Sequence, residues 1–157
     1  MKADFTVEKT YDHPIERVWA ALTSAEALAA WLMPNDFKPV VGHEFTFRTD
    51  PAPGFDGIVR CQVLELVEPT RMVWSWRGGP IDTTVTFTLA PLGSRTRFTM
   101  RHLGFTGLGG QFTRLVLASG SRRIYGSVLP AYLDHLAGRG ELRQVDCDRH
   151  WWRLGRR

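Results

Sequence analysis

The sequence predicts an α+β fold in which one antiparallel β-sheet covers its apolar face with a long C-terminal helix. Three observations lead to this fold class. A strand-like segment at the start is followed by two short helical segments, then by five strand-like segments with short turns, and the helical period returns after Gly104. Short links between consecutive strands imply antiparallel hairpins, and a sheet with one apolar face needs a helical layer to cover it.

The first strand and the two short helices are distinguished by a change of period. Apolar and polar residues alternate over residues 4–9, as in a half-buried strand. From Pro14 to Leu22 the apolar residues recur every three or four positions, which predicts an amphipathic helix with proline at its first position. Ser24 supplies an N-cap for a second short helix that reaches about Leu32.

A meander of strands follows the two helices. Its segments are rich in β-branched and aromatic residues, and clusters of proline, glycine and polar residues separate them. With the first strand they make a sheet of about six strands. The predicted segments are 44–49, 57–67, 71–77, 83–89 and 95–102.

The C-terminal helix is predicted over residues 111–136, where apolar residues lie broadly on one stripe. Gly120 and Pro130 are expected to weaken or bend it, because proline lacks a backbone donor and clashes with the preceding turn. The glycine-rich segment 107–110 does not have the spacing of a dinucleotide-binding loop, so the expectation for it is a loop or hinge.

Composition indicates one globular domain. The chain has 157 residues, of which 43% are hydrophobic, and this is enough for a single core. Its two cysteines are too few for a disulfide framework, and it does not open with a charged-then-apolar leader. No apolar run approaches the roughly 20 residues of a membrane span, so the expected location is the cytoplasm.

The formal charge of +4 comes mostly from the C-terminus. Residues 139–157 hold six arginines against three acidic residues, and they also carry Trp151 and Trp152. We therefore expect a domain over residues 1–138 and a basic extension over 139–157. Arginine interleaved with tryptophan is able to contact phosphates, but a solvated or folded-back extension is the preferred interpretation, and nucleic acid is not an expected partner.

Several motifs, in their order and spacing, resemble a known superfamily. They begin with the run Pro-Ile-Glu-Arg-Val-Trp-Ala-Ala-Leu-Thr at 14–23 and Trp31, and continue with Gly57 before a long strand, Glu-Pro at 68–69 and Trp-Ser-Trp at 74–76. This pattern is similar to the START-like superfamily, also called SRPBCC, Bet v 1-like or polyketide cyclase-like. Within it, the chain resembles the group named after the activator of Hsp90 ATPase, over about residues 3–137.

The resemblance implies a helix-grip fold, in which a curved antiparallel sheet wraps around a long C-terminal helix. It also implies an elongated, largely apolar cavity between the sheet and that helix. Many members carry a Gly-Trp pair in the last helix, where this chain has Ile124 and Tyr125. Segment 106–120 has no counterpart in the pattern, and the extension after Gly138 lies outside it.

An aromatic interior is the main candidate site. Met72, Trp74 and Trp76 share one face of their strand, as do the aromatic residues of the neighbouring strands. Such residues either fill a core or line a small-molecule pocket, and the resemblance favours the pocket. The side chains predicted to line it are Trp31, Phe37, Phe45, Phe47, Met72, Trp74, Trp76, Phe87, Met100, His102, Tyr125 and Leu129.

Catalytic and metal-binding motifs are absent from the sequence. It has no G-x-S-x-G, P-loop, G-x-G-x-x-G or H-E-x-x-H motif, and Cys147 with His150 is short of the four ligands of structural zinc. No catalytic residue, metal or cofactor is assigned. His102 is the most interesting titratable residue, either as a hydrogen-bonded structural histidine or as a polar group that faces the pocket.

Three functions are compatible with these features. The preferred one is a carrier or sensor that binds a small hydrophobic or aromatic molecule. The second, implied by the group name, is a chaperone-associated interaction domain whose partner is a chaperone or the product of a neighbouring gene. The third is a cyclase- or hydrolase-type enzyme acting on a polyketide-like substrate, for which His102, Tyr125 and Arg60 are the candidate polar groups. Oligomer formation is left open.

Overall fold

The computed structural model describes residues 3–51, 53–79 and 81–139. Its elements follow the predicted order of one strand, two short helices, five strands and a long helical segment. They are β1 (Ala3–Tyr11), α1 (Ile15–Leu22), α2 (Ala25–Trp31), β2 (Glu44–Arg48), β3 (Ile58–Val67), β4 (Arg71–Gly78), β5 (Ile81–Leu92), β6 (Arg95–Phe105), α3 (Gly107–Arg123), the π-helical segment η1 (Ile124–Val128) and α4 (Leu129–Leu136).

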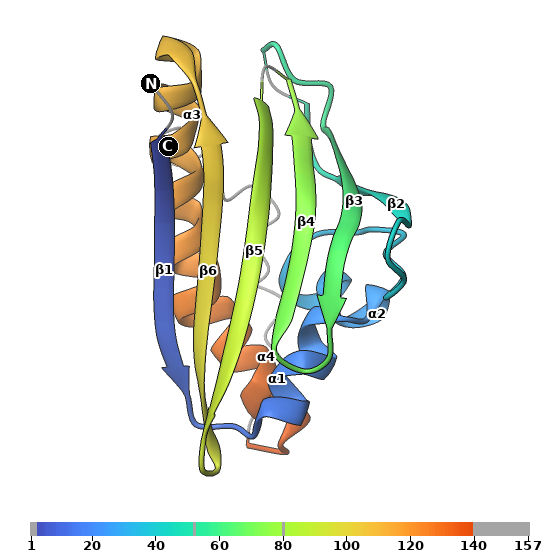
Figure 1. Cartoon of the computed structure of the whole chain (residues 1–157), viewed down its shortest axis with the longest axis vertical. Coiled ribbons are helices and arrows are strands. Elements are labelled where there is room, and N and C mark those ends of the chain that lie inside the picture. The colour runs from blue at the N-terminus through green and yellow to red at the C-terminus, as the bar shows by residue number, and fades with distance from the viewer. Residues whose placement is uncertain (1–2, 52, 80, 140–157) are drawn as a thin grey trace.

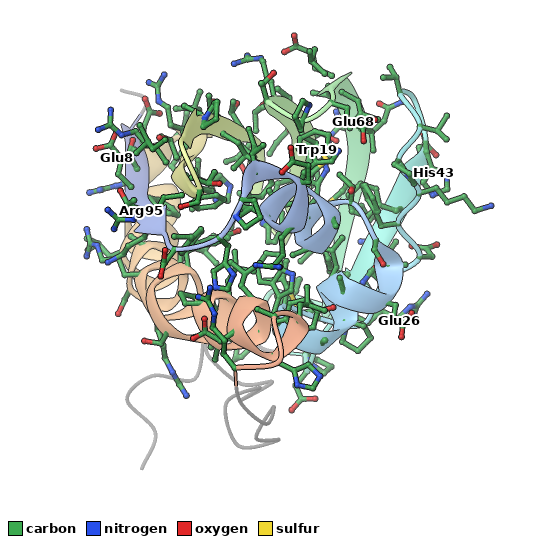
Figure 2. All side chains as sticks on the ribbon, turned by 90° about the horizontal axis from the view of Figure 1, so that it is seen from below. Glu8, Trp19, Glu26, His43, Glu68 and Arg95 are labelled. Atoms are coloured by element: carbon green, nitrogen blue, oxygen red, sulfur yellow. The ribbon has the colours of Figure 1, made fainter. Side chains whose placement is uncertain are left out.

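The strands form one antiparallel sheet in the order β1-β6-β5-β4-β3-β2. All helices lie on one face of this sheet (Figure 1). Seen along the strands, the sheet curves around the helices, and the core fills the space between them (Figure 2). The predicted fold class, an α+β helix-grip arrangement, is confirmed.

The two short helices begin where their capping residues place them. Pro14 is the N-cap of α1 rather than its first helical residue, and its carbonyl accepts hydrogen bonds from the backbone N–H groups of Arg17 and Val18. The Ser24 hydroxyl accepts from the Ala27 N–H at 3.3 Å, as expected for an N-cap serine. Both helices turn their apolar side chains toward the sheet.

Strands β1, β4, β5 and β6 are longer than the sequence pattern indicates, whereas β2 and β3 are each one residue shorter. β5 and β6 pair continuously from Thr84 with Leu103 to Leu92 with Arg95, so the β5–β6 hairpin extends over nearly the whole length of both strands. In β3, Val63 pairs with Trp74 and Glu65 pairs with Val73, which leaves Leu64 as an extra residue in a β-bulge, 42% exposed.

The C-terminal helix differs from the prediction at both its start and its middle. The expected loop at 107–110 is wrong, because α3 begins at Gly107, whose φ of +71° suits glycine at the turn out of β6. The predicted weakening near Pro130 takes the form of η1, a widened turn that ends just before α4. A wide turn relieves the clash between a proline ring and the preceding turn, and it leaves Pro130 in the first turn of α4.

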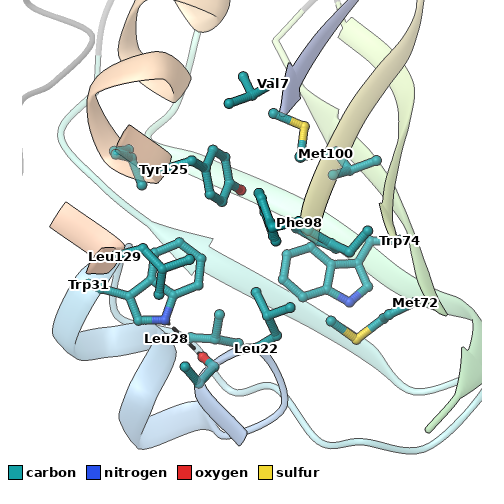
Figure 3. Packing of buried hydrophobic residues seen from close by; sticks show 14 of the residues in the cluster. Val7, Leu22, Leu28, Trp31, Met72, Trp74, Phe98, Met100, Tyr125 and Leu129 are labelled. Atoms are coloured by element: carbon teal, nitrogen blue, oxygen red, sulfur yellow. Dashed lines mark hydrogen bonds between the residues drawn. The ribbon is translucent and has the colours of Figure 1, made fainter. Parts of the chain in front are cut away.

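The core joins the concave face of the sheet to the helices. Trp31 from α2 and Trp74 from β4 are both inside it, and Tyr125 from η1 points toward Phe98 of β6 (Figure 3). The Trp31 indole N–H donates to the Ala21 carbonyl at 2.8 Å, which fixes α2 against α1. This packing sets the position of every side chain in the candidate site.

Candidate ligand site

A cavity of about 20 Å³ lies between the concave face of the sheet and the α3–η1 segment. A void of this size holds about one water molecule. Its wall is mostly apolar but contains four side chains with a polar nitrogen or oxygen atom, those of Trp76, His102, Ser121 and Tyr125. The lining residues are Leu32, Trp76, Val85, Met100, His102, Leu117, Ser121, Ile124 and Tyr125.

Three neighbouring strands and one helical segment bring this lining together. β4, β5 and β6 contribute Trp76, Val85 and His102, with Val85 directly opposite His102 in the sheet. α3 contributes Ser121 and η1 contributes Tyr125 from the other side. Residues more than 40 positions apart in the chain therefore meet only because the helix packs on the sheet.

His102 is held by a chain of two hydrogen bonds. The Thr83 hydroxyl donates its single proton to the Trp76 carbonyl at 3.0 Å. The same oxygen lies 2.7 Å from His102 Nε2, so it must accept a hydrogen bond from that nitrogen. His102 therefore carries its proton on Nε2, and Nδ1 keeps a free lone pair.

Aromatic rings surround His102 and keep it neutral. The ring centroids of Phe105, Phe5 and Trp76 lie 4.6, 5.3 and 5.6 Å from that of the imidazole. Burial among them lowers the pKa of His102 from its usual 6.5 to about 3, because the charged form loses its hydration. At neutral pH this ring is a hydrogen-bonding group and a weak base.

Tyr125 reaches the cavity from the π-helical turn. Its backbone carbonyl accepts a hydrogen bond of 2.6 Å from the Tyr11 hydroxyl, which ties η1 to β1. Burial raises the pKa of the Tyr125 phenol above its usual range, so the phenol stays protonated and able to donate. Among the described residues, neither its hydroxyl nor that of Ser121 has a protein hydrogen-bond partner.

A fully buried polar atom without a partner lies deeper in the aromatic core. Trp74 is fully buried, and its indole N–H has no hydrogen-bond acceptor in the described part of the chain. Its ring is enclosed by aromatic side chains at centroid distances of 4.8–5.8 Å, namely Phe37, Phe45, Phe47 and Phe87. An orphaned buried donor costs about 1–3 kcal/mol, so the chain tolerates a cost here that a bound acceptor would remove.

All the side chains predicted to line the interior are buried. Trp76, Met100, His102 and Tyr125 line the cavity described above. The others pack in the same core but are not part of its lining: Trp31, Phe37, Phe45, Phe47, Met72, Trp74, Phe87 and Leu129.

Arg60, the third polar group considered for an enzyme, does not reach the interior. Its side chain is 57% exposed and forms an ion pair of 3.1 Å with Asp56. It alternates with the buried Val59 and Cys61 in β3, so it points to the convex face of the sheet. That expectation is wrong, and strand alternation was the signal against it.

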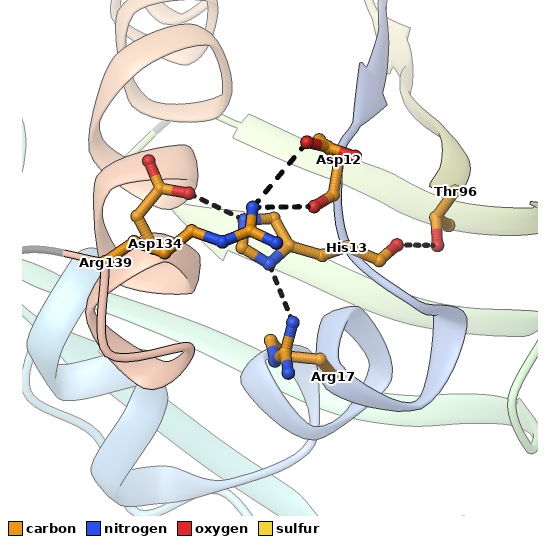
Figure 4. A network of polar contacts seen from close by, with 6 residues as sticks. All are labelled: Asp12, His13, Arg17, Thr96, Asp134 and Arg139. Atoms are coloured by element: carbon orange, nitrogen blue, oxygen red, sulfur yellow. Dashed lines mark hydrogen bonds and ion pairs between the residues drawn. The ribbon is translucent and has the colours of Figure 1, made fainter. Parts of the chain in front are cut away.

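A separate cluster of polar residues surrounds His13, at the end of the molecule where β1 meets α1 and α4 (Figure 4). His13 Nδ1 accepts from the Arg17 guanidinium at 3.1 Å, and Nε2–H donates to Asp134 at 2.8 Å. The Thr96 hydroxyl donates to the His13 carbonyl at 2.8 Å. Both ring nitrogens are occupied by the chain itself, so this His13 cluster is a structural connection rather than a reactive site.

Metal and membrane sites are not indicated by the described residues. No group of three or more histidine, cysteine or acidic side chains among them is arranged to hold a metal ion. None of the helices in the described ranges is long and apolar enough to cross a membrane. The Cys147 and His150 pair and the extension from residue 140 onward lie outside the described residues.

The predicted site residues omit five of the nine lining residues, Leu32, Val85, Leu117, Ser121 and Ile124, and also Thr83 behind the lining. Thr83 sets the protonation of His102, while Leu117 and Ser121 form the helical wall. Thr83 lies on the same alternating face as Val85 and Phe87, which was a usable signal. Leu117 and Ser121 are four positions apart on a helix, but the sequence pattern of that helix is weak.

Comparison with known proteins supports the fold. A family model described as activator of Hsp90 ATPase homolog 1-like protein matches residues 12–136. No curated protein matches the chain. The crystal structure of protein MLL2253 from Mesorhizobium loti is 29% identical, with a TM-score of 0.74, and the match covers 89% of this chain and 100% of that one.

Two further solved structures are similar. Protein BH1534 from Bacillus halodurans is 27% identical, with a TM-score of 0.68, and the match covers 83% of this chain and 96% of that one. CalU16 from Micromonospora echinospora is 18% identical, with a TM-score of 0.70, over 93% of this chain and 82% of that one. At this low identity the CalU16 likeness concerns the fold alone.

Proposed function

The chain belongs to the activator of Hsp90 ATPase homolog 1-like family, and we propose that it binds a small hydrophobic or aromatic molecule as a carrier or sensor. The site is the space between the concave face of the sheet and the α3–η1 segment. One observation carries the proposal. His102, Ser121 and Tyr125, three side chains with hydrogen-bonding groups, line one cavity inside an aromatic core.

Unpaired polar atoms inside an apolar wall are typical of a ligand pocket. A purely structural core satisfies its polar groups, because each buried orphan costs free energy. In the neighbouring aromatic cluster, the indole N–H of Trp74 is the one buried polar side-chain atom of the described residues without a hydrogen-bond partner. A ligand with a few oxygen atoms would satisfy these groups and leave the aromatic surface in contact with its apolar part.

Binding requires the cavity to enlarge. Its volume of about 20 Å³ accepts a water molecule, whereas an engineered cavity that binds benzene measures about 150 Å³. Leu32 at the end of α2 and Leu117 on α3 are the half-exposed members of the lining. We therefore place the entrance between these two leucines, with side-chain rotation and a shift of α3 making room.

Titration with p-xylene tests this function, because the molecule is apolar and has the size of one aromatic side chain. We expect saturable changes in tryptophan fluorescence. Replacing the lining Trp76 by phenylalanine should remove most of the response. The matched control is Trp19→Phe, since Trp19 is equally buried in α1 but outside the cavity lining. A folded protein whose fluorescence and NMR spectrum ignore p-xylene would contradict the proposal.

The two other functions have less support. An enzyme needs a base or nucleophile in the site, and a neutral His102 with a pKa of about 3 is poorly suited to take a proton at pH 7. A chaperone-associated role rests on the family description alone. The cytoplasmic location and a protein partner remain predictions from the sequence.

A further inference from the structure

The polar groups of the His102 cavity define a chemical class of ligand. This inference rests on the proposed ligand-binding function and goes one step beyond it. Besides the indole of Trp76, three residues of the lining supply polar atoms: His102 from β6, Ser121 from α3 and Tyr125 from η1. Their protonation states decide what the cavity is able to recognise.

The His102 ring, which is part of the cavity lining, keeps one hydrogen-bond acceptor and no free donor. The Trp76 carbonyl accepts the Thr83 proton, and the Thr83 oxygen then accepts from His102 Nε2–H. If the Thr83 hydroxyl donated to His102 Nε2 instead, the Trp76 carbonyl and the Thr83 oxygen would face each other with no proton between them. Nδ1 is thus the only other polar atom of the ring, and it holds a lone pair.

The lining also has two hydroxyl groups, each able to donate or to accept, and the Trp76 indole N–H, which only donates. Tyr125 stays a protonated phenol because burial raises its pKa, and Ser121 is neutral at every pH of interest. No lining residue of this cavity carries a charge at pH 7. An ionised ligand would lose its hydration here without gaining a counter-charge, which is costly.

We propose that the His102 cavity binds a neutral aromatic alcohol of the phenol class. The ligand hydroxyl donates to His102 Nδ1, and its oxygen accepts from the hydroxyl of Tyr125 or Ser121. The aromatic ring of the ligand lies between Trp76 and the two leucines at the entrance. The ligand oxygen takes the place for which the cavity already has room.

Three para-substituted toluenes of nearly equal size test this class by isothermal titration calorimetry at pH 7. They are p-cresol, which carries the hydroxyl; p-xylene, which replaces the hydroxyl by a methyl group; and p-toluate, which is an anion. We expect p-cresol to bind about tenfold more tightly than p-xylene, as one net hydrogen bond predicts, and p-toluate to bind more weakly than both.

Each result separates this inference from the proposed function. Equal affinities for p-cresol and p-xylene would overturn the phenol-class assignment and leave a general apolar site. Tightest binding of p-toluate would also overturn it, because it requires a positive charge in the site. Failure of all three probes to bind would overturn the proposed function itself.

Two substitutions locate the preference at Nδ1. In His102→Leu the acceptor is lost, and the affinities for p-cresol and p-xylene should converge to within about threefold. Thr83→Val removes the hydroxyl that fixes the proton on Nε2, so the preference should also fall. Thr88→Val is the matched control, because Thr88 lies on the same strand but is exposed on the convex face, and it should keep the tenfold preference.

Nitrogen-15 NMR reads the tautomer directly and does not depend on whether the variants fold. In the wild-type protein His102 Nδ1 should give the shift of an unprotonated, pyridine-type nitrogen. Adding p-cresol should move this signal toward that of a hydrogen-bonded nitrogen, whereas p-xylene should leave it in place. A protonated Nδ1 in the ligand-free protein would overturn the proposal.

Discussion

Two buried histidines of this protein have the same exposure and opposite surroundings. His13 and His102 are each 3% exposed. The chain occupies both nitrogens of His13, with Arg17 on one side and Asp134 on the other. For His102 it occupies only Nε2, through Thr83, and this ring is part of the cavity lining.

This difference separates a structural histidine from a candidate binding group. Burial alone does not distinguish the two, since both rings are equally removed from solvent. The distinguishing property is whether the fold satisfies every polar atom of the side chain. His13 connects β1, α1 and α4, whereas His102 has one atom that only a water or a ligand is able to satisfy.

The largest effect on stability is expected from His13→Ala. The substitution removes two hydrogen bonds to charged partners and leaves the Arg17 and Asp134 groups without them, so unfolding free energy should fall by about 3 kcal/mol. Urea unfolding measures this change. His43→Ala is the control, because His43 makes one exposed hydrogen bond to the Asp36 carbonyl and should cost less than about 1 kcal/mol. Equal costs would contradict the comparison.

The next largest effect is the pH dependence that His102 imposes. Its pKa falls from 6.5 in the unfolded chain to about 3 in the folded protein, so below pH 6.5 the unfolded state binds the extra proton. The contribution of His102 to the free energy of unfolding is therefore complete above pH 6.5 and is lost as the pH falls toward 3. At pH 5 the loss is about 2 kcal/mol.

His102→Leu should remove this contribution. Urea unfolding of the wild type and the variant at pH 7.5 and pH 5 gives the comparison, and the variant should show the smaller loss on acidification. Parallel pH profiles for the two proteins would show that His102 is not held neutral in the fold.

A smaller effect is expected from Asp134→Asn in the His13 cluster. The asparagine oxygen is still able to accept from His13 Nε2–H, so only the charge is lost. Because the Asp134 side chain is 49% exposed, solvent screens that charge, and the cost should be about 0.5–1 kcal/mol in urea unfolding. A loss as large as that of His13→Ala would mean that the charge, rather than the hydrogen bond, holds this connection.

The smallest effect on stability is expected from Ser121→Ala in the cavity. The Ser121 hydroxyl has no protein hydrogen bond to lose among the described residues, and alanine is the better helix former, so thermal stability should stay the same or rise slightly. The affinity for p-cresol measures the effect of Ser121→Ala on binding, and it should fall severalfold. A clear loss of stability instead would assign Ser121 a structural role like that of His13.

Much of the fold was predictable because local pattern and tertiary structure agree. Alternation along β4 predicted that Met72, Trp74 and Trp76 share the buried face, and all three lie in the core. The capping serine of α2 was also found from sequence. The start of α3 was missed, because its glycine-rich first turn has low helix propensity, whereas α3 as a whole packs against β1 and β6.

The candidate site was predictable only in part. Strand alternation pointed His102 inward, but nothing in the sequence showed that Thr83 would fix its proton or that Ser121 would face it. The two histidines also illustrate this limit, since His13 was not recognised as buried. Its partners Arg17 and Asp134 are 117 positions apart in the chain, and only the folded structure brings them together.

The sequence by itself determined the element order, the antiparallel sheet and the identity of the apolar face, because these follow from local periodicity and turn residues. Only the tertiary structure decided where the buried polar atoms find partners. A hydrogen bond between side chains forms only when two distant segments are placed to within a few tenths of an ångström. The periodicity of the sequence carries no such information. The contrast between a satisfied His13 and a half-satisfied His102 is therefore a property of the fold.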